Sequence, residues 1–349
     1  MKKILFASTA LAALAIGGAA SAEVEMFGDA RLGAGYKVDN DGDVRDTDDE
    51  IQAISRVRFG VTMTGESDAG IPFGATIRAD NAIAGEGTND DRGFSNQRAG
   101  SVFVSGAFGT LTFGDIDEAH QFHVGDLPEL GLTGLGFYNE LPYFGNRGGI
   151  PDGREDADEF DGGITGDNYR PTVRYDYNFA GLGVSVSTGS RLDSVAVGAS
   201  YTFDFGGSSI TAGGGYFDGE ANSADPESGL SDATEANQWV VGAEGTFGGF
   251  NAQVNYTNAE IEDEGDLETV GVGLGTELGV FGVNAFYHRL LENPLGEDDD
   301  DAYGVDMTVD LGGGASIKGG VVRTFSVFQD DDGDTDNETI ADFGISLAF

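Results

Sequence analysis

The segment Phe343-Gly344-Ile345-Ser346-Leu347-Ala348-Phe349 ends the chain, and large apolar residues in it alternate with small ones. Successive side chains of a β-strand point to opposite faces. One face of this strand therefore carries four large apolar side chains, and the other carries only Gly, Ser and Ala. A strand that is apolar on one face, small and polar on the other, and closed by an aromatic residue is typical of the wall of a membrane β-barrel.

The same two-faced pattern recurs along the chain. In residues 55–64, Val57 and Phe59 face one way while Arg56 and Arg58 face the other. The predicted strands cover residues 25–36, 55–64, 73–80, 101–105, 110–114, 173–179, 184–188, 195–203, 210–216, 239–247, 250–256, 270–274, 281–287, 303–309, 317–322 and 343–349. An even number of strands, with about twenty residues for each strand and its connection, suits a single-chain outer-membrane barrel. We expect an all-β fold, a 16-stranded antiparallel up-and-down transmembrane β-barrel.

Connections between the predicted strands alternate in kind. Short ones contain glycine, as in Gly181-Leu182-Gly183, and the long, acidic ones cover residues 39–50, 219–235, 258–266, 291–300 and 329–338. Short turns at one rim and long loops at the other are the layout of an outer-membrane barrel. No segment after the N-terminus has the ~20 continuous apolar residues of a membrane helix. Nothing marks a linker or a second domain.

The N-terminus has the pattern of a cleaved secretory signal peptide over residues 1–22. Lys2-Lys3 precedes an apolar stretch over residues 4–16, and Ala20-Ser21-Ala22 is a small-residue cleavage site. The barrel is then expected over residues 23–349, exported through the periplasm to the outer membrane. A transmembrane anchor is the alternative, but the apolar stretch is too short and glycine-rich to span comfortably.

Composition excludes several classes of protein. The formal net charge is −43, which argues against nucleic-acid binding. The chain has no cysteine, so its fold does not depend on disulfides. The 58 glycines and 7 prolines suit strands with small lumen residues and tight turns.

Charges inside the predicted strands fall on one face. A charge that faces lipid near the bilayer centre costs roughly 2–4 kcal/mol for Arg or Lys, so this face should line the lumen. It carries Arg31, Arg56, Arg58, Arg78, Asp80, Arg174, Asp176, Glu244 and Asp306. Lys318 and Arg323 have opposite parities, so one of them must lie at a strand end or beside a bulge. A soluble β-sandwich would also alternate, but the signal peptide, strand count, loop asymmetry and terminal Phe favour the barrel.

Aromatic residues near the predicted strand ends suit the girdles of a membrane barrel. They are Tyr36, Tyr201, Phe203, Trp239, Phe247, Tyr256, Tyr287, Tyr303 and Phe349. Each alone is also compatible with ordinary packing.

Four arginines gather on the lumen face of the first three strands: Arg31, Arg56, Arg58 and Arg78. Like charges this close are unfavourable unless acids lie opposite. The longest irregular segment, about residues 115–168, supplies Asp115, Asp117, Glu118, Asp126 and Glu129. It is also too apolar for free solvent, so we expect this third loop to fold into the barrel and form a charged constriction. The alternative is that the arginines merely neutralise carboxylates of the lumen.

A constriction of this kind predicts a water-filled channel for passive diffusion of small hydrophilic solutes and ions, weakly selective for cations. A solute-specific barrel channel is one alternative. An outer-membrane hydrolase is another, but His120, His123 and His288 have no nucleophile paired with them locally in the sequence. A calcium-binding repeat protein would need a Gly-Gly-x-Gly-x-Asp period, which the sequence does not contain. We expect no enzymatic activity and no required cofactor.

The chain resembles the Gram-negative trimeric general-diffusion porins, most of all their alphaproteobacterial, Rhodobacter-type branch. The resemblance covers the whole mature chain and rests on the order of short segments. These are Glu23-Val24 with Gly28-Asp29-Ala30-Arg31, Ser55-Arg56-Val57-Arg58-Phe59, Met63-Thr64-Gly65, Val102-Phe103-Val104-Ser105-Gly106-Ala107-Phe108-Gly109, Phe113-Gly114-Asp115, Gly125-Asp126-Leu127, Leu311-Gly312-Gly313-Gly314-Ala315-Ser316-Ile317 and the closing Phe. It implies a homotrimer in contact with lipopolysaccharide, and assembly by the barrel assembly machinery through Phe349. By position it also implies that Arg31, Arg56, Arg58 and Arg78 face Asp115, Asp117, Asp126 and Glu129, while residues 148–163 look like an acidic insertion in the third loop.

Calcium is a secondary expectation. Asp330, Asp332, Asp334 and Asp336 are spaced two apart around Gly333, as in oxygen-ligand loops. The EF-hand spacing is incomplete, and a solvated acidic loop is the simpler interpretation.

Overall fold

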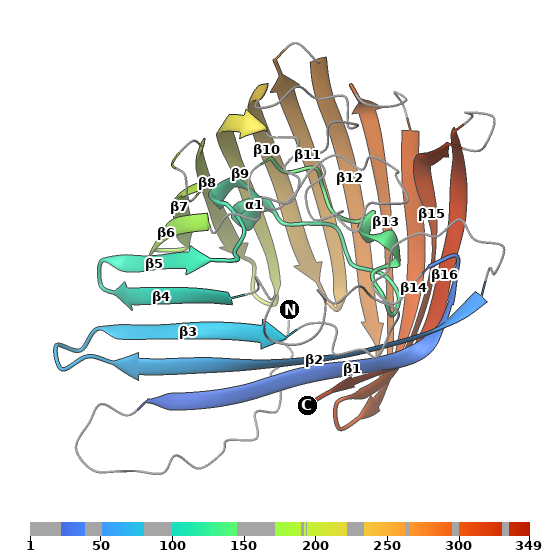
Figure 1. Ribbon diagram of the computed structural model, residues 1–349, viewed down its shortest axis with the longest axis horizontal. Helices are drawn as coiled ribbons and strands as arrows, with labels where there is room; N and C mark the ends of the chain where they lie inside the picture. Colours follow the sequence, from blue (N-terminus) through green and yellow to red (C-terminus); the bar gives the residue numbers. More distant parts are fainter. Residues whose placement is uncertain are drawn as a thin grey trace, which may run out of the picture.

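The computed structural model is a closed antiparallel β-barrel of sixteen strands (Figure 1). Each strand pairs with its neighbours in sequence, and β1 closes the barrel against β16. The structure describes residues 22–38, 51–79, 100–144, 172–189, 192, 194–221, 234–262, 265–294, 300–329 and 335–349. The predicted fold class is confirmed, whereas the predicted signal peptide lies almost wholly outside the described residues.

The strands are β1 (Glu23–Tyr36), β2 (Ile51–Glu66), β3 (Pro72–Ala79), β4 (Gly100–Gly106), β5 (Gly109–Gly114), β6 (Thr172–Phe179), β7 (Leu182–Gly189), β8 (Ser194–Asp204), β9 (Ser208–Ala221), β10 (Thr234–Phe247), β11 (Phe250–Ile261), β12 (Gly265–Leu278), β13 (Phe281–Glu292), β14 (Asp300–Gly312), β15 (Ala315–Gln329) and β16 (Thr335–Ala348). A helix, α1 (Ala119–Val124), and a 3-10 turn, η1 (Leu135–Phe137), lie between β5 and β6. No helix among these described residues has the length and apolar character to cross a membrane.

The C-terminal strand lies in register with β1, so the two ends of the chain seal the barrel. Leu32 is opposite Ile345, and the N–H of Phe349 donates to the carbonyl oxygen of Gly28 at 2.9 Å. The exposed Leu32 (54%) and Val57 (48%) contrast with the buried Arg31 (4%). The predicted apolar face is therefore the outside of the barrel, and the predicted charged face is the inside.

Lys318 and Arg323 have opposite parities, and one of them lies beside an irregularity of the strand, as predicted. Lys318 is on the inward face, opposite Thr308 and Gly344. Arg323 lies outward beside a register shift between β15 and β16, and it donates to Asn337 at 2.7 Å. The exposed position and the shift allow an outward charge at the strand end.

Tight turns join the strands at one end of the barrel. Gly248 and Gly249 have φ of +56° and +93°, values that glycine adopts without strain and that suit a two-residue hairpin. At the other end most of the predicted long loops are too wide. The largest error is at residues 258–266, where β11 runs to Ile261 and β12 starts at Gly265, and β16 likewise starts at Thr335, inside the predicted loop 329–338. Outward Glu260 and inward Ile261 continue the alternation there. The strands project beyond their apolar band, so their acidic ends have the composition of a loop.

The outer wall is not uniform around the barrel. Strand β2 has 16 residues, whereas β5 has 6. The residues on both sides of β5 are described, so both of its ends are defined. Outward tyrosine and tryptophan side chains are prominent on β9 to β14, where Trp239 and Tyr256 lie with ring centroids 5.0 Å apart. The described outward positions of β2 to β5 carry neither residue.

Candidate functional site

The segment that follows β5 turns into the barrel. Residues 115–144, with α1 and η1, cross the inside along the strands from β7 to β16 (Figure 1). The inward fold expected for the third loop is confirmed for this part. Residues 145–168 of the predicted loop, including the acidic stretch 148–163, lie outside the described residues.

An apolar core lies inside the barrel between this loop and the wall. Tyr138, Phe144 and Leu130 are 0–2% exposed, and inward Phe217 and Phe325 from β9 and β15 are equally buried. The small and polar inward face of the C-terminal strand therefore does not extend to every strand. The loop covers the inward face of these strands, so burial of apolar area there is favourable rather than costly.

Inward glycines let the loop backbone approach the wall closely. A Cβ added at Gly213 would lie 1.9 Å from the carbonyl oxygen of His123, and one at Gly198 would lie 2.1 Å from that of Ala119. A Cβ at Gly273 would lie 2.4 Å from Pro128. These distances exclude a side chain, so glycine is needed at these three positions, where α1 and the following residues rest on the sheet.

Carboxylates from the wall hold the turn over residues 131–134. The carboxylate of Asp342 accepts hydrogen bonds from the N–H of Leu132 at 2.8 Å, the N–H of Thr133 at 2.7 Å and the hydroxyl of Thr133 at 2.8 Å. Asp306 accepts from the N–H of Gly131 at 3.1 Å. On the other side, Nη1 of Arg31 donates to the carbonyl oxygen of Leu132 at 3.1 Å. The turn is thereby fixed to β14, β16 and β1.

Amide side chains anchor the rest of the loop. Gln238 on β10 accepts from the N–H of Phe144 at 2.9 Å and donates to the carbonyl oxygen of Pro142. Asn255 donates to the carbonyl oxygen of Gly125 at 2.9 Å, and Gln253 to that of Asp126 at 2.8 Å. The sequence signal for these anchors was an amide at an inward position of a strand.

The four predicted arginines are neighbours on β1, β2 and β3. Arg31 is directly opposite Arg56, Asp29 is opposite Arg58, and Gly60 is opposite Arg78. We call Arg31, Arg56, Arg58 and Arg78 the arginine wall. Asp29, which sequence reasoning left out of the site, lies among them, with its carboxylate 3.8 Å from Nη2 of Arg56.

The arginine wall divides into two pairs. Arg31 and Arg56 are 4% and 8% exposed, whereas Arg58 and Arg78 are half-buried. Arg31 is engaged with the loop at Leu132. Only Arg58 and Arg78 thus present a substantial surface to an entering ion.

The predicted loop acids are not equivalent either. Glu129 is exposed, and its carboxylate interacts electrostatically with Arg56. Asp126 instead accepts from the N–H of Leu141 at 3.0 Å, which stabilises the loop itself. Glu118 is 3% exposed, while Asp115 and Asp117 are half-buried. Glu129 is therefore the acid that the described part of the loop exposes opposite the arginines.

A second charged cluster, which sequence reasoning missed, lies on β6 under α1. Nε of Arg174 donates to Asp176 at 2.9 Å, and its Nη1 donates to the carbonyl oxygen of Asp117 at 2.5 Å. The guanidinium carbon lies 3.7 Å from the ring centroid of Phe122. The inward parity of Arg174 and Asp176 was correct, but parity gave no sign that the loop helix would cover them.

His123 joins this cluster through two serine hydroxyls. Its Nδ1 is 2.8 Å from Oγ of Ser200 and its Nε2 is 2.8 Å from Oγ of Ser185, which donates to Asp176 at 2.6 Å. Because the hydroxyl of Ser185 donates its hydrogen bond to the Asp176 carboxylate, Nε2 of His123 donates to Ser185 and Nδ1 accepts from Ser200. Burial lowers the pKa of His123, which favours this neutral form. No hydroxyl is paired with His123 locally in the sequence, as expected, and its serine partners come from the distant strands β7 and β8.

The other histidines are buried in the apolar core. The ring of His120 lies 5.6 Å from that of Tyr143 and 5.5 Å from that of Phe217, and burial lowers its pKa to about 3. Nδ1 of His288 donates to the carbonyl oxygen of Tyr138 at 3.0 Å. Both histidines act in packing and in holding the loop.

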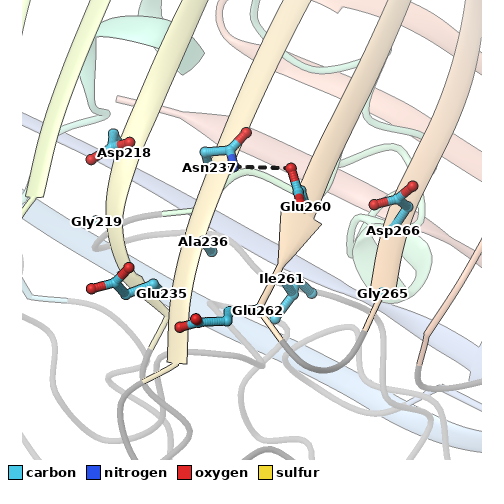
Figure 2. Close-up of a pocket in the computed structure, with 10 residues that line it drawn as sticks. All are labelled: Asp218, Gly219, Glu235, Ala236, Asn237, Glu260, Ile261, Glu262, Gly265 and Asp266. Atoms are coloured by element: carbon cyan, nitrogen blue, oxygen red, sulfur yellow. Dashed lines mark hydrogen bonds between the residues drawn. The ribbon is translucent and has the colours of Figure 1, made fainter.

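A hollow of about 640 Å³ lies at the long-connection end of β9 to β12, away from the arginine wall (Figure 2). Asp218, Glu235, Glu260, Glu262 and Asp266 line it, and Asn237 donates to Glu260 at 3.5 Å. Within the described ranges no group of three or more His, Cys, Asp or Glu side chains could hold a metal ion. Of the predicted calcium ligands, Asp330, Asp332 and Asp334 lie outside those ranges, and Asp336 lies in β16 with its side chain not described.

Comparisons with known proteins agree with this architecture. A family model described as Gram-negative porin matches residues 7–332. A porin from Rhodobacter capsulatus is 28% identical over 356 residues, which cover 94% of this chain and 100% of that protein. A porin structure refined at 1.8 Å resolution has a TM-score of 0.63 at 26% identity, over 94% of this chain and 100% of the other. An anion-selective porin from Comamonas acidovorans has a TM-score of 0.61 at 18% identity, over 94% and 100%, which shows a shared fold alone.

Proposed function

The chain belongs to the Gram-negative porin family and so forms a channel in the outer membrane, and we propose that the arginine wall and Glu129 form its constriction. The observation that supports this proposal is that Glu129 is exposed on the loop and interacts electrostatically with Arg56 of the arginine wall. Ions and small hydrated solutes would pass between the two. Bulky or apolar solutes would lose hydration there without compensation and be slowed.

We propose that the channel is weakly selective for cations. The chain carries a net charge of −43, and carboxylates line the hollow at the long-connection rim (Figure 2). Acids near the mouth raise the local concentration of cations within a Debye length, about 8–10 Å at physiological salt. The inward arginines oppose this preference, so a weak net selectivity is expected rather than a strong one.

The reversal potential of the reconstituted protein in a salt gradient tests both statements. Arg78→Ala should raise the conductance and shift the reversal potential further toward cations, because it removes a half-buried positive charge from the constriction. Glu129→Gln should shift it toward anions. Arg323→Ala, which removes an exposed charge from the outside of the barrel, is the matched control. A reversal potential unchanged in both lumen variants would remove these residues from the constriction.

We further propose that the protein acts as a homotrimer, joined through the outer faces of β2 to β5. Strand β5 has 6 residues, about 20 Å of extended chain, and when tilted it is too short for the ~25 Å apolar band that lipid would require. Apart from Ser55 and Met63, the large outward side chains of this wall are aliphatic or phenylalanine, and many are exposed, as Val57 (48%) and Val102 (52%) illustrate. Neighbouring copies would cover such a wall.

The absence of cysteine makes this interface simple to test. Val102→Cys should crosslink between copies in membranes, whereas Val254→Cys on the opposite wall should not. Equal crosslinking at both positions would contradict the proposed interface.

We propose two further partners from the location of the channel in the outer membrane. The outward Trp239, Tyr216 and Tyr256, with carboxylates above them, suit contact with lipopolysaccharide. The exposed Phe349 (65%) suits recognition by the assembly machinery, so its deletion should lower the amount of folded protein in outer membranes.

We propose no enzymatic role. The Ser200–His123–Ser185–Asp176 chain of hydrogen bonds joins α1 to the wall, and burial of His123 between α1 and the wall (9% exposed) suits that task. A lipase or esterase assay on the purified protein distinguishes a channel from an outer-membrane hydrolase. Hydrolysis that is lost in Ser200→Ala would favour the hydrolase.

A further inference from the structure

Phe122 is the one large apolar residue that the described part of the inward loop exposes. Of the described residues 115–144, only Phe122 and Glu129 are exposed, and Phe122 has 48% of its surface accessible. The helix that carries it does not need this exposure for packing, because Ala119, His120 and His123 seat α1 on the wall. The other exposed large apolar side chains of the described residues lie on outward strand positions or in connections between strands.

The ring of Phe122 is held in one orientation. The Arg174 guanidinium stacks on it at 3.7 Å, and Arg174 is itself fixed by Asp176 and the carbonyl oxygen of Asp117. The ring of His123 meets it edge-on, with centroids 5.2 Å apart and an interplanar angle of 74°. A ring restrained in this way loses little entropy when a ligand stacks on it.

Hydrogen-bonding groups and a second ring share this part of the lumen. Thr112 on β5 is directly opposite Arg174, and Phe103 on β4 is directly opposite Thr112. Phe103 therefore lies about two strand spacings, roughly 10 Å, from Arg174 on the same inward face. The Asp117 side chain beside the cluster is half-buried and its carboxylate is an acceptor.

An aromatic face bordered by hydroxyl and carboxylate groups has the chemistry that binds sugars. The C–H face of a pyranose packs on an aromatic ring, while its hydroxyl groups donate to carboxylates and exchange hydrogen bonds with threonine. A charged solute would gain less, because the Arg174 guanidinium already occupies one face of the ring and is paired with Asp176.

We propose that Phe122 is a stacking subsite for pyranose sugars on their way through the lumen. This inference rests on the proposed function only in that solutes must enter the lumen, and it concerns a site distinct from the arginine wall. The subsite would make the passage of a cyclic sugar saturable, whereas an open-chain polyol of the same size would pass without binding.

The test compares D-glucose with sorbitol, an open-chain hexitol of nearly equal mass, in planar bilayers containing many channels. Conductance is measured as each solute is titrated at matched viscosity. Glucose should lower the conductance in a saturable manner beyond the viscosity effect that sorbitol produces. Phe122→Leu, which keeps apolar bulk but removes the ring, should weaken the apparent affinity for glucose about twofold to tenfold.

Two variants separate stacking from a structural role. Phe122→Tyr keeps the ring and should retain the glucose response, and Gln121→Ala, on the same helix, should leave it unchanged. Identical curves for glucose and sorbitol in the unmodified protein would overturn the subsite, as would wild-type glucose affinity in Phe122→Leu. Absence of any conductance in the unmodified protein would instead contradict the proposed function.

Discussion

Removal of the Asp342 carboxylate should release the turn at residues 131–134 from the wall. In Asp342→Ala the N–H groups of Leu132 and Thr133 and the hydroxyl of Thr133 lose their acceptor. Asp342 is 6% exposed, so water does not readily replace the carboxylate while the turn stays in place. The turn would then exchange between attached and detached positions.

The size of this effect follows from the hydrogen bonds. A hydrogen bond to a charged group contributes roughly 1.5–3 kcal/mol, so three of them would give about 5–9 kcal/mol if they added. They share one acceptor and are not additive, and removing a buried charge also recovers some desolvation energy. We therefore expect about 3 kcal/mol in favour of the detached turn, which is roughly a hundredfold change in its population.

Amide hydrogen exchange of the detergent-solubilised protein measures this population directly. The amides of residues 131–133 should exchange about a hundredfold faster in Asp342→Ala, and single-channel current noise should rise. Asp310→Ala is the control, because Asp310 accepts only a local bond from Gly312 in a turn at the other end of the barrel. Exchange of residues 131–133 within twofold of the unmodified protein would refute the role assigned to Asp342.

Three further predictions concern the loop and the acidic segments. Gly213→Val should displace α1 and lower the thermal stability of the barrel, because its Cβ would lie 1.9 Å from the carbonyl oxygen of His123; Gly282→Ala, whose nearest contact is 3.7 Å, should have little effect in the same melting assay. Burial lowers the pKa of His120 to about 3 from the usual 6.5, so between these values the unfolded state binds more protons and stability falls as pH falls. Loop detachment, measured by amide exchange, should rise up to tenfold per pH unit below 6.5, and His120→Phe should flatten this dependence. If residues 330–336 bind calcium, Ca²⁺ but not Mg²⁺ should raise the melting temperature, and Asp332→Asn should abolish that increase; equal melting curves with and without Ca²⁺ would exclude the site.

The sequence predicted the barrel well because a membrane imposes a rule on every strand. Lipid on one side and water on the other force a period of two, so once the chain is assigned to a membrane barrel, Val57 and Arg56 show which side of β2 faces out. The arginine wall followed from the same rule, since charged residues of neighbouring strands must share the inward face; which of them are directly opposite depends on the register. The extent of β11 and β12 was underestimated because acidic strand ends that leave the apolar band look like loop in composition.

The contacts of the inward loop could not be predicted in the same way. Which strands α1 rests on depends on the path of an irregular segment, and the only local signs were glycines such as Gly213 at inward positions. Parity also cannot distinguish a lumen position that meets water from one that meets the loop, as Phe217 and Arg78 show. For this reason Asp342, Arg174 and Phe122 became visible only in three dimensions.

The apolar core inside the barrel has a consequence for how permeability can evolve. The strands that carry Phe217 and Phe325 pack against the inward loop. A substitution there therefore disturbs the support of the loop before it changes which solutes pass. In the described residues, the side chains of Arg58, Arg78 and Thr112 are not part of this apolar core. Mutations on that side can therefore retune which nutrients or toxins enter the cell while the folded frame is inherited unchanged.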